Sequence, residues 1–316
     1  MSLKKGNVYT TVKGAADAPW LLVLPGVGCG GFVFAEAMPH LVRYFNVCLV
    51  NQPWVDGAVY PGLTKPADLT VDFLAQIVAE IFKEVGMETA HVLGHSMGGF
   101  VAQRLALEHP GFIRRLVLMS TSYGGLRTDI DTRHVLFEQL LPTKAGVAHM
   151  PGAHALAALM FPAPFHEENP EAFRNALAMF KGKFDREDVL GLHMMCGARF
   201  SSFGDVRGIM APTLVVHGTA DKVVRETSGR KLAEELPQAR YWPVSGRGHL
   251  PFLEEPAVLG RVTDFLLGDD SVGMPVPQSP PPTAVELAAD RMWRHSRAHL
   301  TSLPRLMAVL GSLKGN

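Results

Sequence analysis

Five short, mainly hydrophobic runs recur along the chain. They occupy residues 20–24, 45–50, 90–93, 115–119 and 213–217. Runs without regular polar alternation are typical of strands that are buried on both faces, as in a parallel sheet. We therefore expect these runs to be strands of one buried sheet.

Patterns with helical periodicity lie between and after these runs. In residues 70–85 the hydrophobic positions form one stripe, which begins at Thr70 and ends before Gly86. Segments 97–109, 226–236 and 250–267 are interpreted as further helices. The alternation predicts right-handed crossovers with helices on both faces of the sheet. The expected fold class is α/β, with a mostly parallel, doubly wound sheet.

Two interruptions of this alternation suggest a division into parts. Residues 1–122 and 205–267 are expected to form the α/β core, and 123–204 a helical cap rich in Ala, Met, Phe, His and Pro. Residues 268–282 contain five prolines and predict a linker. Residues 283–316 then predict a C-terminal helical tail.

Composition and charge exclude several classes of protein. Hydrophobic residues make up 47% of the 316 residues and charged residues 19%, which excludes a disordered chain. Thirty Lys and Arg balance thirty Asp and Glu, so no net charge attracts nucleic acid or an anionic membrane. We expect no signal peptide and no transmembrane segment. Three cysteines cannot all pair, which favours a reducing cytoplasm.

A candidate nucleophile lies in residues 94–99, Gly-His-Ser-Met-Gly-Gly, which fit the pattern G-x-S-x-G. A predicted strand ends directly before the pattern and a predicted helix begins directly after it. On such a sharp turn the flanking glycines avoid clashes, and the Ser96 hydroxyl is lifted above the sheet. The helix that begins at Met97 would direct free N–H groups towards an oxyanion. The alternative is an ordinary glycine-rich turn between a strand and a helix.

From about residue 8 to residue 267, the chain resembles the α/β-hydrolase family of Ser-His-acid esterases, lipases, thioesterases and lactonases. Besides the serine turn, the similarity rests on residues 217–224, His-Gly-Thr-Ala-Asp-Lys-Val-Val, and on 245–252, Ser-Gly-Arg-Gly-His-Leu-Pro-Phe. The family order of nucleophile, acid and histidine implies Ser96 as nucleophile, Asp221 as the orienting acid and His249 as base. Asp205 remains a rival for the acid. The His95 side chain is expected to point away from the substrate and to serve packing or hydrogen bonding.

The first glycine-rich loop, residues 24–31, allows two interpretations. The family resemblance implies that it supplies an oxyanion N–H, here from Val27, with Met97 as the second donor. Alternatively, its glycines match G-x-G-x-x-G, the fingerprint of a dinucleotide site. That site also needs an acidic residue about 20 positions later, whereas the next strand ends in Asn51 and Gln52. We therefore expect no cofactor.

The predicted cap and the predicted tail bear on the expected substrate and partners. The apolar cap makes a strongly anionic substrate unfavourable, and its histidines lack a recognisable metal-binding spacing, so no metal is expected. The tail could dock on its own domain, lie on a membrane or form a homodimer.

The expected reaction is hydrolysis of a carboxylic ester with an apolar, small to medium acyl or alkyl group. It proceeds through an acyl-enzyme on Ser96. Thioester hydrolysis, lactone opening, C–C bond hydrolysis and acyl transfer to another acceptor would use the same residues and stay open. A non-catalytic binding or interaction module on the same fold is the alternative of another class.

Overall fold

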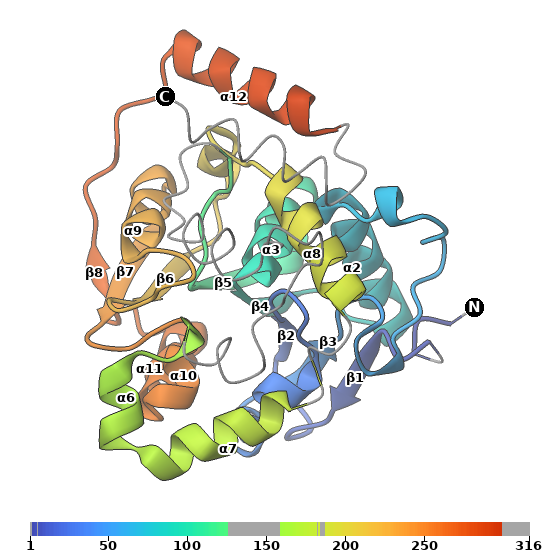
Figure 1. Ribbon diagram of the computed structural model, residues 1–316, viewed down its shortest axis with the longest axis vertical. Helices are drawn as coiled ribbons and strands as arrows, with labels where there is room; N and C mark the ends of the chain where they lie inside the picture. The colour runs from blue at the N-terminus through green and yellow to red at the C-terminus, as the bar shows by residue number, and fades with distance from the viewer. Residues whose placement is uncertain (1, 5, 126–158, 182, 184–186, 299–316) are drawn as a thin grey trace, which may run out of the picture.

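The computed structural model describes residues 2–4, 6–125, 159–181, 183 and 187–298. Within them, eight strands form one sheet in the order β1-β3-β2-β4-β5-β6-β7-β8 (Figure 1). The strands are β1 Tyr9–Val12, β2 Trp20–Leu24, β3 Asn46–Val50, β4 Ala90–His95, β5 Ile113–Met119, β6 Thr213–Gly218, β7 Ala239–Val244 and β8 Met274–Pro275. β1 and β8 are antiparallel to their neighbours, and the strands between them are parallel. The predicted α/β class with a mostly parallel sheet is confirmed.

Helices cover both faces of this sheet. The helices of the described part are α1 Met38–Leu41, α2 Val71–Val85, α3 Met97–Glu108, α6 Ala163–Glu168, α7 Pro170–Phe180, α8 Glu187–Arg199, α9 Glu226–Glu235, α10 Pro251–Glu254, α11 Ala257–Leu267 and α12 Ala284–Ala298. Helices α2, α3 and α9 pack on one face, and α1 and α11 on the other. None of these helices is long and apolar enough to cross a membrane.

The central strands are buried on both faces, as their sequences predict. In β2, Leu22 and Leu24 join the hydrophobic core beneath α2 and α3, whereas Leu21 and Val23 join the core beneath α1 and α11. Successive side chains of a strand point to opposite faces, so an uninterrupted apolar run supplies both cores at once.

Helix α2 begins and ends where the sequence predicts, because both ends have local caps. The Thr70 side chain accepts a hydrogen bond from the N–H of Phe73, which caps the first turn. Gly86 ends the helix with a φ of 75°, a left-handed conformation that glycine adopts without steric cost.

Two stretches differ from their predicted form. Residues 250–267 were expected to be one helix, but Pro256 separates α10 from α11 because proline disfavours helical geometry in the residue before it. The predicted linker at 268–282 contains β8, which pairs with β7. Strand β7 is not predicted, because it contains Pro243 and only two of its six positions, Tyr241 and Val244, are buried.

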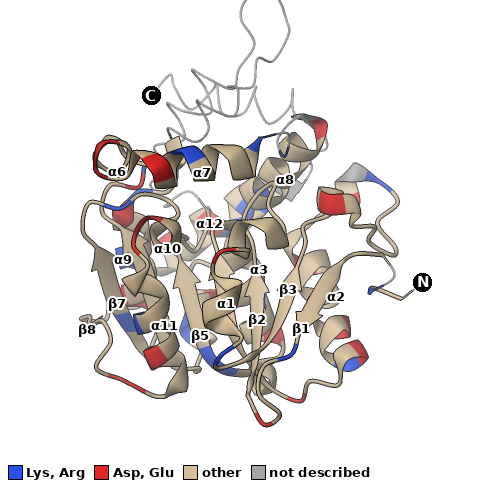
Figure 2. Cartoon of the chain, turned by 90° about the horizontal axis from the view of Figure 1, so that it is seen from below, with Lys and Arg blue, Asp and Glu red and all other residues tan. Residues whose placement is uncertain are grey.

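Helices α6, α7 and α8 follow β5 and lie across one end of the sheet (Figure 2). They belong to the segment 123–204 that the sequence assigns to a cap, of which residues 126–158 lie outside the described residues. The division into a core and a separate cap stays a prediction.

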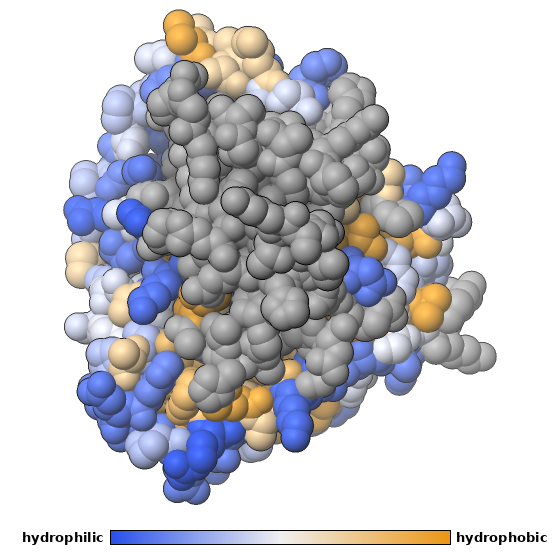
Figure 3. Space-filling model, in the orientation of Figure 1, coloured by the Kyte–Doolittle hydropathy of each residue, from blue (hydrophilic) through white to orange (hydrophobic). Residues whose placement is uncertain are grey.

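Helix α12 docks on its own chain. The buried carboxylate of Asp290 accepts hydrogen bonds from Ser201 Oγ at 2.7 Å and from Arg294 Nε at 2.6 Å. On the outward face, Val285 and Met292 are 79% and 74% exposed. Figure 3 shows hydrophobic surface at the upper edge of the molecule, where Figure 1 places α12. Docking is therefore the observed state of residues 284–298, and a homodimer through the tail stays a prediction.

Candidate active site

Ser96 occupies a strained turn between β4 and α3. Its φ of 53° and ψ of −121° lie in a region that residues other than glycine rarely adopt. A Cβ on Gly98 would come within 2.1 Å of the Leu24 carbonyl oxygen, so only glycine lets α3 begin this close to β2. The glycines of the G-x-S-x-G pattern thus serve the close packing expected of them.

Thr121, which follows the neighbouring strand β5, holds this turn. Its Oγ1 donates a hydrogen bond to the Ser96 carbonyl at 2.7 Å, and the Ser96 N–H donates to the Met119 carbonyl at 2.9 Å. A Cβ on Gly99 would lie 2.6 Å from the Thr121 side chain. No local sequence signal indicates this contact, because it depends on the pairing of β4 with β5.

His249 and Asp221 meet at the ends of two adjacent strands. Asp221 follows β6 and His249 follows β7, and these strands pair in parallel. His249 Nδ1 lies 2.8 Å from Asp221 Oδ2. The other oxygen, Oδ1, accepts from the N–H groups of Val223 at 2.8 Å and Val224 at 3.0 Å. The structure therefore brings two of the three expected triad residues into direct contact and fixes the carboxylate.

A second histidine, His217, also contacts this carboxylate. Its Nε2 lies 3.3 Å from Asp221 Oδ2 and 2.8 Å from the Val224 carbonyl oxygen. Burial by itself would raise the pKa of Asp221, but the charge of His249 and the hydrogen bonds from both histidines outweigh it and lower the pKa below its usual range. Asp221 is thus held as a carboxylate. His217 stands four residues before Asp221 in the segment 217–224, but nothing in that segment predicts that its ring contacts the carboxylate.

The loop that carries His249 is held by a buried glutamate. Both carboxylate oxygens of Glu254 lie 2.9 Å from the N–H of Gly248, and the His249 N–H donates to the Met160 carbonyl at 2.8 Å. Burial raises the pKa of Glu254 to about 7. No local sequence signal marks Glu254, since acidic residues in a first helical turn are common.

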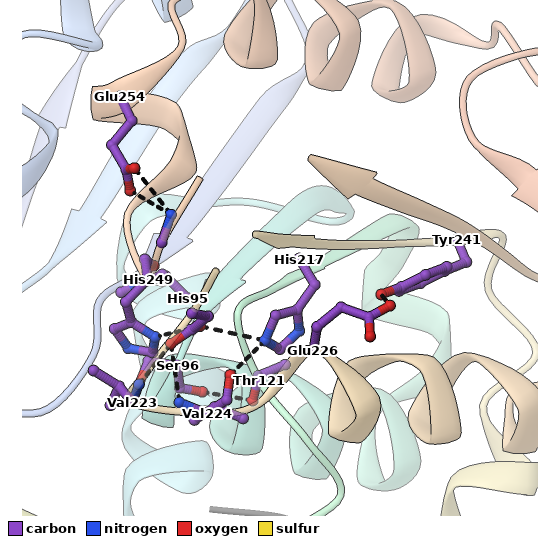
Figure 4. A network of polar contacts seen from close by, with 12 residues as sticks. His95, Ser96, Thr121, His217, Val223, Val224, Glu226, Tyr241, His249 and Glu254 are labelled. Atoms are coloured by element: carbon purple, nitrogen blue, oxygen red, sulfur yellow. Dashed lines mark hydrogen bonds and ion pairs between the residues drawn. The ribbon is translucent and has the colours of Figure 1, made fainter. Parts of the chain in front are cut away.

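His95 lies beneath the histidine loop and has a structural role. Its Nε2 lies 2.9 Å from the His249 carbonyl oxygen, and the two rings are 4.9 Å apart (Figure 4). Burial lowers the pKa of His95 to about 3, so the ring is neutral at ordinary pH. A neutral ring can donate from Nε2 to this carbonyl, which agrees with the expected hydrogen-bonding role.

The glycine loop passes over the serine. A Cβ on Gly26 would lie 3.4 Å from Ser96 Oγ and 3.0 Å from Ser96 Cβ. Among the described residues, no protein acceptor takes the N–H of Val27 or of Met97. In the described part of the chain, the two expected oxyanion donors, one in the glycine loop and one at the start of α3, therefore have no protein acceptor.

The other candidates lie elsewhere or are already engaged. Asp205, the rival acid, pairs with Arg294 of α12 at 2.8 Å. The three cysteines are buried, and burial raises the pKa of the Cys29 thiol to about 12, which disfavours a reactive thiolate. In the described part of the chain, no cluster of His, Cys, Asp or Glu has the arrangement of a metal site. In the glycine loop, the Gly31 N–H already donates to Asn51 Oδ1 at 2.8 Å.

Comparison with known proteins identifies the family. Residues 19–256 match the family model of the alpha/beta hydrolase fold. The RutD protein of Caulobacter sp. (strain K31), which carries the name of a carbamate hydrolase, is 28% identical over 83% of this chain and 97% of its own length. The pimeloyl-[acyl-carrier protein] methyl ester esterase of Chromobacterium violaceum is 28% identical over 78% of this chain and 92% of its own.

A solved structure has the same architecture. A hydrolase from Pseudomonas aeruginosa PA01 superimposes with a TM-score of 0.66 and 26% identity, covering 82% of this chain and 93% of its own. The region that matches the family model contains strands β2 to β7, the serine turn and the loops that carry Asp221 and His249. The chain belongs to the α/β-hydrolase family and is a hydrolase of that fold.

Proposed function

We propose that this hydrolase cleaves carboxylic esters with an apolar, small to medium acyl or alkyl group, through an acyl-enzyme on Ser96. In this proposal His249 is the general base and Asp221 its orienting acid. The N–H groups of Val27 and Met97 form the oxyanion hole.

The contact between His249 and Asp221 carries the proposal. With Nδ1–H donating to an ionised carboxylate, the Nε2 atom of His249 has its lone pair available to accept a proton. The strained turn presents Ser96 at the same end of the sheet, beneath the glycine loop. A serine hydroxyl needs such a base to become a nucleophile.

The reaction then has two steps, acylation of Ser96 and hydrolysis of the acyl-enzyme. Ser96 Oγ attacks the ester carbonyl carbon while its proton passes to His249 Nε2, and the same proton is given to the alkoxide as the C–O bond breaks. Water next attacks the carbonyl carbon of the acyl-enzyme and gives a proton to His249. The bond to Ser96 Oγ then breaks, the carboxylic acid leaves, and His249 returns the proton to Ser96. Charge on the carbonyl oxygen in both steps is stabilised by the two free N–H groups.

The preference for an apolar substrate rests on the helices over the sheet end. Phe161, Phe165 and Phe180 are buried there, and the Phe180 ring packs edge to face against Phe32 beside the glycine loop. Helices with such an apolar interior, placed over the serine end of the sheet, would favour an apolar group over a strongly anionic one. The methyl ester esterase among the relatives supports an ester as the scissile group.

The test is a chain-length series of p-nitrophenyl esters, with a thioester, a lactone and a carbamate as alternative substrates. Ser96→Ala is expected to abolish turnover and labelling by a fluorophosphonate. Ser120→Ala is a matched control, because Ser120 has a positive φ of 50°, like Ser96, and follows the neighbouring strand β5. Labelling of any residue other than Ser96, or ester turnover that survives Ser96→Ala, would contradict the proposal.

A further inference from the structure

His193 of helix α8 joins two loops next to the serine. The N–H of Gly28 donates to His193 Nδ1 at 3.1 Å, and His193 Nε2 lies 3.0 Å from the Pro53 carbonyl oxygen. A ring nitrogen that accepts must be unprotonated, so the proton is on Nε2 and is donated to Pro53. The ring is 0% exposed. This residue, far away in the sequence, thus completes hydrogen bonds that neither loop makes by itself.

The first of these loops contains the proposed oxyanion donor. Gly28 directly follows Val27 and has a φ of 67°, a left-handed conformation. The turn is closed by a hydrogen bond from the Cys29 N–H to the Gly26 carbonyl at 3.2 Å. The Val27 N–H belongs to the peptide group between Gly26 and Val27. The carbonyl oxygen of this group is bound by Cys29, and the next peptide group is bound by His193 through the Gly28 N–H. The direction of the Val27 N–H therefore depends on where α8 places the imidazole.

The second loop, which contains Gln52 and Pro53, is hydrogen-bonded to the glycine loop. Gln52 Nε2 donates to the Pro25 carbonyl at 2.8 Å, and the Gln52 N–H donates to the Cys29 carbonyl at 3.2 Å. Pro53, which follows, accepts from His193. Both loops and α8 thus form a closed set of buried hydrogen bonds, in which the ring of His193 is the link to the helix.

A second contact ties the segment before α8 to the same two loops. The ammonium of Lys183 lies 2.6 Å from Asp56 Oδ1 and 4.9 Å from the centre of the Phe32 ring. Asp56 lies three residues after Pro53, and Phe32 lies four residues after Gly28. This more exposed ion pair is expected to be weak. It nevertheless shows that the segment between α7 and α8 contacts residues that lie just after both loops.

We propose that His193 is a positioning residue, which holds the glycine loop so that the Val27 N–H faces the oxyanion and thereby couples the docking of α8 to completion of the oxyanion hole. This inference rests on the proposed function of Ser96 and Val27. It assigns to α8 a part in catalysis that needs no contact with the substrate.

Two variants separate the two hydrogen bonds. In His193→Asn, the side-chain oxygen takes the place of Nδ1 and accepts from Gly28. In His193→Gln, the amide nitrogen takes the place of Nε2 and donates to Pro53, and Gly28 has no acceptor. We expect His193→Asn to keep kcat within about 5-fold of the wild type. We expect His193→Gln to lose about 10–100-fold in kcat with KM changed less than about 3-fold, since loss of one oxyanion donor outright costs about 10²–10³.

The rate at which a fluorophosphonate labels Ser96 is measured beside kcat, because its phosphoryl oxygen occupies the same hole. Arg199→Met is the matched control: Arg199 ties α8 to the Ala67 carbonyl at 3.2 Å, away from the glycine loop. It is expected to lower Tm without slowing labelling. Should His193→Gln not fold, His193→Leu replaces it, because leucine keeps an apolar volume and accepts no hydrogen bond.

The outcomes are distinct. Slower labelling in His193→Gln or His193→Leu, restored in His193→Asn, supports the positioning role. If wild-type Ser96 is labelled, the inference is overturned when His193→Gln reacts as fast as the wild type. It is also overturned when both amide variants lose activity only in step with Tm. If Ser96 of the wild type is not labelled at all, the proposed function fails, and the inference that rests on it fails with it.

Discussion

The Nδ1 atom of His249 lies 2.8 Å from Oδ2 of Asp221, although the two residues are 28 positions apart in the sequence. Strands β6 and β7, which end just before them, pair in parallel and bring the two loops to the same edge of the sheet. The contact decides which tautomer the imidazole adopts, and the first prediction follows from it.

Asp221→Asn is expected to lower kcat for an ester by about 10³–10⁴-fold, because the amide neither stabilises the imidazolium nor enforces the Nδ1–H tautomer. KM should change little. Steady-state kinetics with a p-nitrophenyl ester measure both constants. Asp205→Asn is the control, since Asp205 pairs with Arg294 instead. A larger loss in Asp205→Asn than in Asp221→Asn would make Asp205 the acid.

Gly26→Ala is expected to reduce kcat at least about 10-fold. The added methyl would lie 3.0 Å from Ser96 Cβ and 3.2 Å from His95 Nδ1, so the loop or the serine must shift. A shift of the nucleophile by a fraction of an ångström is costly in a positioned site. Unchanged kcat in this variant would show that the loop does not confine Ser96.

Gly260→Ala provides the matched glycine control for that experiment. Gly260 lies inside α11, and a Cβ there would meet no atom within 4 Å. Alanine is favoured over glycine in a helix interior, so the free energy of unfolding should rise by about 0.5–1 kcal/mol. Urea denaturation measures this gain, and kcat should stay at the wild-type value.

Glu254→Gln is expected to change how stability depends on pH. Burial raises the pKa of Glu254 to about 7 in the folded state, against about 4.3 for an exposed glutamate. The folded state therefore binds the proton more tightly, and the free energy of unfolding decreases as the pH rises from about 4.3 to 7. Ionisation of Glu254 is expected to lower the free energy of unfolding by up to about 3 kcal/mol.

The glutamine variant removes this titration and keeps an oxygen that can accept from Gly248. Between pH 5 and pH 8, the wild type should thus lose more stability than the variant, by about 1–3 kcal/mol in urea denaturation. Parallel curves for the two proteins would mean that Glu254 titrates normally in the folded state.

Asp290→Ala is expected to lower the free energy of unfolding by about 1–3 kcal/mol, because it leaves the buried hydroxyl of Ser201 without its acceptor. Arg291→Ala, at an exposed position of the same helix, should change stability by less than about 0.5 kcal/mol. Sedimentation of both variants tests the tail as a dimer contact. If α12 serves only its own chain, both variants keep the oligomeric state of the wild type.

The sequence by itself determined the features that depend on neighbouring residues. The uninterrupted hydrophobic runs predicted β2 to β6, because a strand buried on both faces has no polar side to display. The glycines around Ser96 predicted the turn, because a side chain at those positions clashes with adjacent backbone. Thr70 and Gly86 predicted the ends of α2, since helix caps are satisfied locally.

Only the tertiary structure decided which distant groups meet. It placed Asp221, and not Asp205, against His249, and it added His217 as a second contact of the carboxylate. It also brought His193 to Gly28 across 165 positions of sequence. These contacts depend on strand order and helix docking, which are set by burial of the whole core and not by any local pattern. A buried polar group needs a partner, but its own sequence context does not specify which distant residue supplies it.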